Sequence, residues 1–299
     1  MKRLGSYVNG NYTVHIFDDG TKIRINNLDH LIPAFPESID MKICNRCDMG
    51  CPMCHEQSVP DGALADLNHP ILDTLQPYTE LALGGGNPLE HPDLPAFLAR
   101  MKEKDVICNL TVHLNHFLAN AGQLYEWCAN GLLHGIGISI NSNVPASVIQ
   151  TIRQFPNAVV HVIAGIAPLS VYESLYDQDI KLLILGYKDF GRGFVYGKSH
   201  PDLTFQISDT ASALPAIVKH FPVVSFDNLA IKQLDVKKII PKDKWNTCYM
   251  GDDGQFTMYI DLVQQQYAIS STSPRHNLVQ ATIADVFQAV KEESSNGRD

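Results

Sequence analysis

The sequence predicts an α/β protein built around a mainly parallel sheet. From residue 40 onward, short apolar runs alternate with segments of helical periodicity, an order typical of βαβ units. The apolar runs are rich enough for strands that are buried on both faces. Six strand–helix units in this order favour a partial, TIM-like (β/α)6 barrel. A doubly wound sheet remains open at this point, because periodicity alone does not separate the two architectures.

The predicted elements follow from these patterns in chain order. The strands are expected at 40–44, 79–84, 105–111, 134–140, 158–164 and 181–186. The helices are expected at 69–77, 93–103, 116–129, 144–154, 168–177 and 210–220. Asp93-Leu94-Pro95 and Asn143-Val144-Pro145 each join a capping residue to an early proline, which marks the start of a helix.

The flanking segments predict smaller β structures. Residues 6–26 alternate around a turn at Asp18–Thr21 and predict an N-terminal hairpin. Residues 221–235 are expected to extend the sheet at its open edge, 255–270 to form a second hairpin, and 281–292 to form a helix. The predicted domains are therefore 1–39 (hairpin and lead-in), 40–220 (barrel) and 221–299 (an α+β extension covering the edge or mouth of the barrel).

The charge and hydropathy of the sequence restrict the partners and the compartment that we expect. The 299 residues carry a net charge of −9, which argues against nucleic acid as the main partner. No apolar run reaches the roughly 20 residues that a membrane helix needs, and the N-terminus lacks an apolar signal core. We therefore expect a cytoplasmic protein without a membrane partner, in a compartment where thiols stay reduced.

Four of the seven cysteines lie within eleven positions, at Cys44, Cys47, Cys51 and Cys54. The last three make a C-x3-C-x2-C pattern, and soft thiolates select iron–sulfur clusters, zinc or Cu(I). A [4Fe–4S] cluster usually takes four cysteines, so three would leave one iron open to another ligand. Two alternatives are weaker: the spacing is too short for a usual four-cysteine zinc site, and no secretory signal supports disulfides.

These residues resemble the signature of the radical S-adenosylmethionine (SAM) family, on the loop after the first barrel strand. Ile43–Cys47 and Cys51–Cys54 are similar to the family's run from strand to cluster, although Met53 stands where an aromatic residue or histidine is common. The resemblance implies that Cys47, Cys51 and Cys54 hold a [4Fe–4S] cluster. Cys44 falls where many members carry threonine, so it is left outside the cluster.

Two further segments extend the resemblance to the binding of SAM. Gly84, Gly85, Gly86 and Asn87 resemble the family's glycine-rich motif, which holds the amino group of SAM, with an amide in place of the usual acid. On its own, the glycine run also fits a tight turn. Ser139 and Asn141, at the end of the fourth strand, match the position that contacts the ribose and carboxylate, although such residues also cap turns and helices.

The last two strands resemble the adenine side of the family's site. Gly165 ends the fifth strand, and Tyr187 follows the sixth strand ahead of Gly191-Arg192-Gly193. The resemblance implies contacts from Gly165 and Tyr187 to the adenine. We interpret His161, within the fifth strand, as a packed core or second-layer histidine rather than a ligand.

The resemblance implies an oxygen-sensitive enzyme with SAM and the cluster as cofactors. Such an enzyme cleaves SAM reductively to a 5′-deoxyadenosyl radical, which abstracts hydrogen from a peptide or small-molecule substrate. A flavodoxin or ferredoxin would supply the electron. The alternatives are a glycyl-radical activating enzyme, or an electron-transfer or sensor protein with Cys44 as a fourth ligand. The sequence leaves open the substrate, the electron donor, the fate of SAM and the oligomeric state.

The remaining cysteines differ in their surroundings. Cys108 and Cys128 fall in predicted core elements, where cysteine acts as a small apolar residue. Cys248 lies outside the barrel repeat, in the segment 245–251. We predict that its loop lies near the open end of the barrel, which makes Cys248 a candidate radical quencher or substrate contact.

Overall fold

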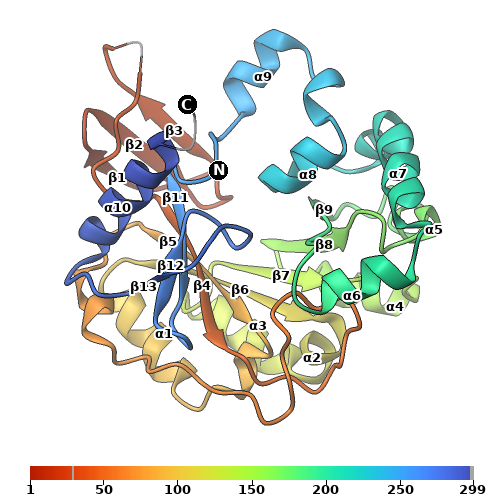
Figure 1. Cartoon of the computed structure of the whole chain (residues 1–299), viewed down its shortest axis with the longest axis horizontal. Coiled ribbons are helices and arrows are strands. Elements are labelled where there is room, and N and C mark those ends of the chain that lie inside the picture. The colour runs from red at the N-terminus through yellow and green to blue at the C-terminus, as the bar shows by residue number, and fades with distance from the viewer. Residues whose placement is uncertain (29, 297–299) are drawn as a thin grey trace.

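A ten-stranded sheet organises the molecule in a computed structural model that describes residues 1–28 and 30–296 (Figure 1). Its strand order is β10-β9-β8-β7-β6-β5-β4-β11-β12-β13. The bounds of these strands are β4 Ser38–Cys44, β5 Glu80–Gly85, β6 Ile107–His113, β7 Gly135–Ser139, β8 Ala158–Ile163, β9 Lys181–Leu185, β10 Val224–Phe226, β11 Thr257–Asp261, β12 Gln266–Ala268 and β13 His276–Asn277.

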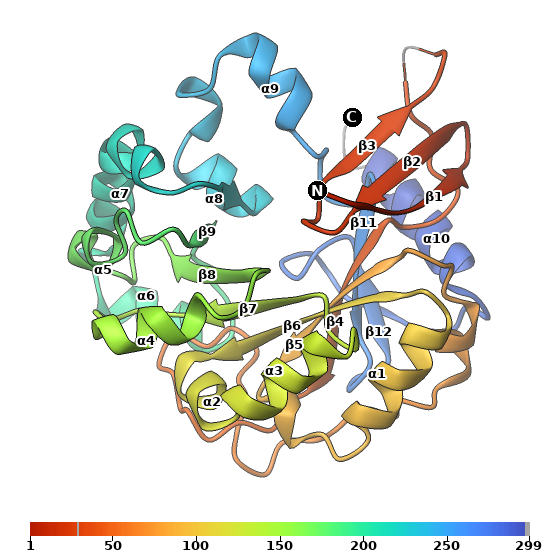
Figure 2. The same ribbon diagram turned by 180° about the vertical axis from the view of Figure 1, so that it is seen from behind.

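The strand order confirms the prediction of an α/β protein with a mainly parallel sheet. Strands β4 to β10 are neighbours in the same order as in the chain, and each pair is parallel. The order turns back once, because β11 lies on the other side of β4 and pairs with it in parallel. The sheet curves, and its two edge strands β10 and β13 stay apart (Figures 1 and 2). The sheet is therefore open and curved, with strands β4 to β10 in chain order and β11 to β13 added beyond β4.

The helices agree with the prediction in order but differ in length. Residues 69–77 form only the short 3-10 helix η1 (Pro70–Thr74), and the predicted helix at 116–129 breaks at Asn120. The predicted helix at 210–220 begins earlier, as α7. The α-helices are α1 Leu94–Glu103, α2 Leu114–Ala119, α3 Ala121–Ala129, α4 Ala146–Ile152, α5 Leu169–Ser174, α6 Arg192–Ser199, α7 Leu203–Ile217, α8 Asn228–Gln233, α9 Lys242–Cys248 and α10 Ile283–Asn296.

The two faces of the sheet differ in polarity. On one face, apolar residues such as Met41, Leu83 and Val160 pack with helix residues into one large core. Since side chains alternate along a strand, their neighbours point to the opposite face, which we call the inner face. Seven inner-face residues matter below: Asp40, Lys42, Gly84, Thr111, Ser139, His161 and Asp261.

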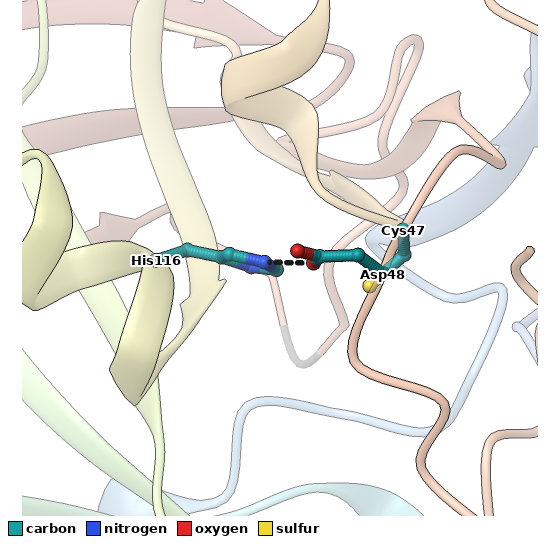
Figure 3. A group of neighbouring side chains, drawn as sticks. All are labelled: Cys47, Asp48 and His116. Atoms are coloured by element: carbon teal, nitrogen blue, oxygen red, sulfur yellow. Dashed lines mark hydrogen bonds and ion pairs between the residues drawn. The ribbon is translucent and has the colours of Figure 1, made fainter. Parts of the chain in front are cut away.

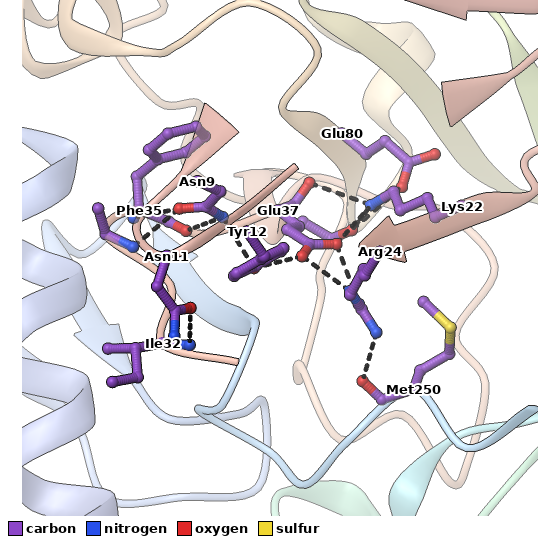
Figure 4. Close-up of polar contacts among 12 residues, drawn as sticks. Asn9, Asn11, Tyr12, Lys22, Arg24, Ile32, Phe35, Glu37, Glu80 and Met250 are labelled. Atoms are coloured by element: carbon purple, nitrogen blue, oxygen red, sulfur yellow. Dashed lines mark hydrogen bonds and ion pairs between the residues drawn. The ribbon is translucent and has the colours of Figure 1, made fainter. Parts of the chain in front are cut away.

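A separate three-stranded antiparallel sheet precedes the main sheet. It consists of β1 (Arg3–Asn9), β2 (Tyr12–Phe17) and β3 (Lys22–Ile25), so the predicted hairpin is present and β1 was missed. Buried Glu37 attaches it to the start of β4 (Figure 4). The Glu37 carboxylate accepts hydrogen bonds from the Tyr12 hydroxyl at 2.6 Å and from Arg24 at 2.8 and 2.9 Å.

The predicted C-terminal extension joins the main sheet. β10 pairs with β9 and extends the sheet at that edge, as expected. β11 and β12 form the predicted hairpin, and β11 also pairs in parallel with β4, which the sequence did not indicate. The predicted final helix is α10. Among the described residues, no helix is both long and apolar enough to cross a membrane.

Candidate functional site

The cysteine motif occupies the loop after β4, at the carboxyl edge of the parallel strands. Cys47, Cys51 and Cys54 are partly exposed and free of disulfides. Burial raises the pKa of the Cys47 thiol, and the nearby Cys51 and Cys54 thiols raise it further. Burial and the charge of Cys54 likewise raise the pKa of Cys51. The three thiols are thus close enough to act on one another electrostatically.

Cys44 is set apart from these three thiols. Its side chain is fully buried at the end of β4. The sulfur lies 3.3 Å from the carbonyl oxygen of Arg46 and 3.2 Å from its amide nitrogen, which donates to it. Because these backbone contacts hold the thiol inside the protein, a set of three cysteines fits the structure better than a zinc site of four.

A polar pair stands beside Cys47 (Figure 3). His116 Nε2, from α2, lies 2.7 Å from Asp48 Oδ1, and this contact lowers the pKa of the Asp48 carboxyl. The ligand atoms of Cys47, Asp48 and His116 lie within 4.8 Å of one another. The pair ties the cysteine loop to the end of β6. Sequence reasoning missed it because 68 residues separate its members.

A buried network of charged side chains fixes the end of the cysteine loop, just after Cys54. Lys42 Nζ, on the inner face, lies 2.7 Å from Glu56 Oε2 and 3.4 Å from Asp261 Oδ2 on β11. Glu56 Oε1 also accepts from the Tyr259 hydroxyl at 3.2 Å. The favourable contacts with His55 and Lys42 outweigh burial and hold the pKa of Glu56 well below its usual range. Two residues after Cys54, the chain is thus clamped to β4 and β11.

The segment Gly191-Arg192-Gly193 supports the same loop from α6. Arg192 donates from Nε to the Cys51 carbonyl at 3.1 Å and from its backbone amide to the Cys54 carbonyl at 3.2 Å. A Cβ on Gly191 would lie 2.3 Å from the His55 carbonyl oxygen, and the φ of Gly191 is +59°. The glycines therefore let α6 approach the cysteine loop, a role that the adenine-side resemblance did not indicate.

The three glycines at the end of β5, Gly84 to Gly86, differ in their surroundings. A Cβ on Gly85 would lie 2.2 Å from the Cys44 carbonyl oxygen, and one on Gly86 would lie 2.2 Å from that of Arg46. Both glycines therefore pack against the start of the cysteine loop. Gly84 is different, because its Cβ would meet only the Thr111 Cβ, at 3.9 Å. Gly84 alone leaves open space on the inner face.

The side chain of Asn87 bonds within its own turn, whereas the sequence resemblance implied a contact with the amino group of SAM. Its side chain is buried, accepts from the Leu89 amide at 3.3 Å and donates to Glu90 Oε1 at 3.2 Å. These bonds cap the short 3-10 helix η2 (Pro88–Glu90). The Asn87 amide is therefore engaged within its own turn, and we leave it out of the site proposed below.

The polar residues after β7 are better placed to receive a ligand. Ser139 ends β7 on the inner face. Asn141 Oδ1 is buried, and no described residue donates a hydrogen bond to it. A buried acceptor without a donor costs free energy unless a bound molecule or water supplies one. Asn141 therefore retains the capacity that the sequence resemblance assigned to it.

Gly165 and Tyr187, the two predicted adenine contacts, make contacts with other residues of the protein. At Gly165, φ is +79° and a Cβ would meet the side chains of Ile207 and Leu203, so the residue admits α7. Tyr187 is buried; its amide donates to Gln233 Oε1 at 2.8 Å, and its carbonyl accepts from Gln233 Nε2 at 2.8 Å. The Tyr187 hydroxyl donates to the Gly193 carbonyl. Tyr187 has no unused polar group, so we remove it from the site.

The prediction for Cys248 is wrong. Cys248 ends α9, which lies at the opposite end of the molecule from the loop that follows β4 (Figures 1 and 2). Two residues later, the Met250 carbonyl accepts from Arg24 at 3.4 Å, beside Glu37 and the amino end of β4 (Figure 4). The cysteine loop leaves the carboxyl end of that strand. Sequence order alone could not show which end of the sheet the segment reaches.

His161 lies on the inner face and not in the apolar core, so of the two interpretations only that of a second-layer histidine remains. It is partly exposed, and its ring occupies the space where Gly137 lacks a side chain. The ring makes no hydrogen bond or ion pair within the part of the chain that the structure describes. Burial lowers the pKa of His161 to about 4.

This pKa predicts a loss of stability in mild acid. The unfolded chain binds a proton at His161 below its ordinary pKa near 6.5, whereas the folded chain resists it down to about 4. Between pH 7.5 and pH 5, His161 should therefore reduce the free energy of unfolding by about 2 kcal/mol. Urea titrations of the wild type and of His161→Gln at both pH values measure the difference. Equal pH dependence in the two proteins would contradict the expectation.

The fold and the cysteine loop together define an α/β protein with a thiol-lined site at the carboxyl edge of its sheet. Similar solved structures are those of SuiB from Streptococcus suis. With precursor peptide SuiA bound, SuiB has a TM-score of 0.56 at 11% identity, over 86% of this chain and 65% of SuiB. With S-adenosylmethionine bound, the TM-score is 0.52 at 11% identity, over 82% of this chain and 64% of SuiB.

A third SuiB structure has a TM-score of 0.54 at 11% identity, over 94% of this chain and 86% of SuiB. The chain thus spans just under two thirds of SuiB as it stands in the two ligand-bound structures. No protein-family model matches the sequence, and no curated protein matches it. What the chain shares with SuiB is the fold.

Proposed function

We propose that the protein is a radical SAM enzyme whose [4Fe–4S] cluster is held by Cys47, Cys51 and Cys54. The observation that carries the proposal is the position of these three free thiols on one loop at the carboxyl edge of the sheet, where α/β folds place their ligands. The SuiB-like fold supports it, because SuiB has been solved with S-adenosylmethionine bound.

The donors fit the cluster and its ligand. Three partly exposed thiols suit an iron–sulfur cluster, while Cys44 is retained by the backbone of Arg46. The unpartnered acceptor of Asn141 and the open space at Gly84 suit S-adenosylmethionine. Held by these residues, the two groups would supply reductive cleavage of S-adenosylmethionine to methionine and a 5′-deoxyadenosyl radical, which would abstract hydrogen from the substrate.

The protein's own residues hold the cysteine segment in position and shield it. The Lys42–Glu56 pair and Arg192 fix the two ends of the segment that carries Cys51 and Cys54. We propose that a substrate approaches this segment from the inner face. We propose a peptide as the substrate, since the peptide-bound SuiB shares this fold. A flavodoxin or ferredoxin remains our proposed electron donor.

The test is anaerobic reconstitution of the wild type and four single variants. The wild type should bind iron and sulfide and form 5′-deoxyadenosine from S-adenosylmethionine under dithionite. Cys47→Ser, Cys51→Ser and Cys54→Ser should each lose the iron, whereas Cys44→Ser should retain both iron and cleavage. Iron loss in Cys44→Ser equal to the other three would refute the three-ligand site. A reducible cluster without 5′-deoxyadenosine would instead favour an electron-transfer or sensor protein.

A further inference from the structure

The loop between β12 and β13, residues 270–275, reaches across the open side of the curved sheet, and we call it the strap. At its tip, the Ser271 hydroxyl accepts a hydrogen bond from Lys188 Nζ at 2.8 Å. Lys188 follows β9, and six strands (β8, β7, β6, β5, β4 and β11) lie between β9 and β12 in the sheet. In Figures 1 and 2 the loop after β12 points towards β8 and β9. The Lys188–Ser271 bond therefore joins two arms of the sheet that strand pairing leaves apart.

The base of the strap lies on the inner face. Tyr259 on β11 pairs in register with Asp40 on β4, so its side chain points to the same face. The guanidinium of Arg275, at the end of the strap, lies 3.9 Å from the centre of the Tyr259 ring. Arg275 also donates to the Ser271 carbonyl at 2.9 Å, which ties the base of the strap to its tip. The strap thus runs over the inner face from Tyr259 to Lys188.

Lys188 also connects the strap to the cysteine loop. Its Nζ lies 3.3 Å from His55 Nε2, and His55 directly follows Cys54. Phe190 packs edge-on against the His55 ring, with 5.3 Å between the ring centroids. The tip of the strap is therefore fastened beside the segment that we propose as the cluster site.

Polar contacts hold the strap, so it can open without disrupting the apolar core. Its six residues read Ser-Ser-Thr-Ser-Pro-Arg and include no large apolar side chain. Thr272 and Pro274 are exposed. The Ser270 hydroxyl lies 3.0 Å from those of Thr272 and Ser273, within the strap itself. Segments with few buried apolar contacts open locally at a small cost in free energy.

We propose that the strap is a gate over the inner face and that the Lys188–Ser271 bond keeps it closed. Opening breaks this bond, frees Arg275 from Tyr259 and admits ligands to the inner face. Closure separates the bound ligands from water, as mobile loops do at other enzyme sites. The inference deepens the proposed function and rests on it for the identity of one ligand, S-adenosylmethionine. Lys188 acts here as a positioning residue and takes no part in bond cleavage.

Tryptic cleavage after Arg275 measures opening of the strap in the protein as purified, without any cofactor. Lys188→Met and Ser271→Ala each remove the bond from one side, so each should speed this cleavage about tenfold. The double variant should be no faster than either single variant, because both lose the same bond. Mass spectrometry follows the fragments, and cleavage at other lysines and arginines should keep its wild-type rate.

Lys181→Met is the matched control. Lys181 begins β9 at its amino end, whereas Lys188 follows the carboxyl end of the same strand. Its Nζ likewise donates to a side-chain oxygen of another segment, Asn157 Oδ1, at 3.1 Å. Removing this bond leaves the strap fastened, so Lys181→Met should be cleaved after Arg275 at the wild-type rate.

Exchange of S-adenosylmethionine on the anaerobically reconstituted protein tests the gate itself. A gate that does not touch the ligand slows its entry and its exit by the same factor. Lys188→Met and Ser271→Ala should therefore each raise the association and dissociation rates about tenfold and leave Kd unchanged. Rapid filtration with radiolabelled S-adenosylmethionine measures both rates, and Lys181→Met should keep those of the wild type.

Each result has a defined meaning. Faster cleavage in Lys188→Met alone would assign the effect to the His55 contact and overturn the role of the Lys188–Ser271 bond. Unchanged exchange rates, or a higher dissociation rate without a higher association rate, would overturn the gate. A wild type that binds no S-adenosylmethionine would count against the proposed function. Cleavage after Arg275 then decides alone, and equal rates in wild type, Lys188→Met and Ser271→Ala would overturn the inference.

Discussion

Replacing Gly86 with alanine should destabilise the protein by about 3 kcal/mol and prevent loading of the proposed cluster, although Gly86 is not one of its proposed ligands. The new Cβ would lie 2.2 Å from the Arg46 carbonyl oxygen and 2.8 Å from its carbon, and backbone atoms cannot rotate out of the way. The Gly86 amide also donates to the Cys44 carbonyl at 2.6 Å. The strain therefore falls on the start of the cysteine loop. Urea unfolding and iron counts measure both effects.

Gly84 provides the matched control two positions earlier. Its added Cβ would meet only the Thr111 Cβ, at an ordinary contact distance of 3.9 Å. Gly84→Ala should keep the stability and the iron of the wild type, and should weaken binding of S-adenosylmethionine if the ligand lies over the open space. Wild-type stability in Gly86→Ala would show that the loop yields, and would return Gly86 to the list of candidate ligand contacts.

Replacing Lys42 with methionine should cost about 3–5 kcal/mol, because it leaves two buried carboxylates without their shared cation. Lys42 is 7% exposed, its partner Glu56 11% and its partner Asp261 7%, so water replaces little of the lost interaction. Methionine preserves most of the side-chain length and removes only the charge. Urea unfolding of cluster-free protein measures the loss without interference from iron.

An exposed ion pair serves as the comparison. Lys238 pairs with Asp235 three residues away, and their side chains are 79% and 54% exposed. Lys238→Met should change the free energy of unfolding by less than about 0.5 kcal/mol. Adding Glu56→Gln to Lys42→Met should restore part of the stability, since one unpaired charge is removed. Similar losses in Lys42→Met and Lys238→Met would mean that the Lys42 network contributes no more than a surface pair.

Local patterns predicted the repeating part of the fold. The six strands were found because each is a short apolar run beside a segment of helical period, and pairing between chain neighbours follows from that order. The break at Asn120 and the short η1 were missed because hydrophobic periodicity continues across ends that hydrogen bonds define.

The site was predictable where its residues are close in sequence. The cysteine spacing marked the loop, and Asn141 was named from its place at a strand end. Contacts between distant segments were not visible. Lys42 was not singled out, because its partner Asp261 on β11 is more than two hundred residues away. Tyr187 was chosen for its position in a motif, and only the structure shows that Gln233 occupies its backbone groups.

The pairing of β11 with β4 has a consequence for synthesis of the chain on the ribosome. Strands β4 to β10 can associate with the neighbour that has just emerged, because each contact closes a short loop. β11 instead returns to a strand made more than two hundred residues earlier, where Met258 aligns with Ile39. Until β11 is in place, Lys42 lacks its partner Asp261, and Glu56, which follows the last cysteine of the loop, lacks its contact with Tyr259. We expect nascent chains that end before β11 to leave the cysteines open to oxidation, so the proposed cluster should be loaded only after β11 has been made.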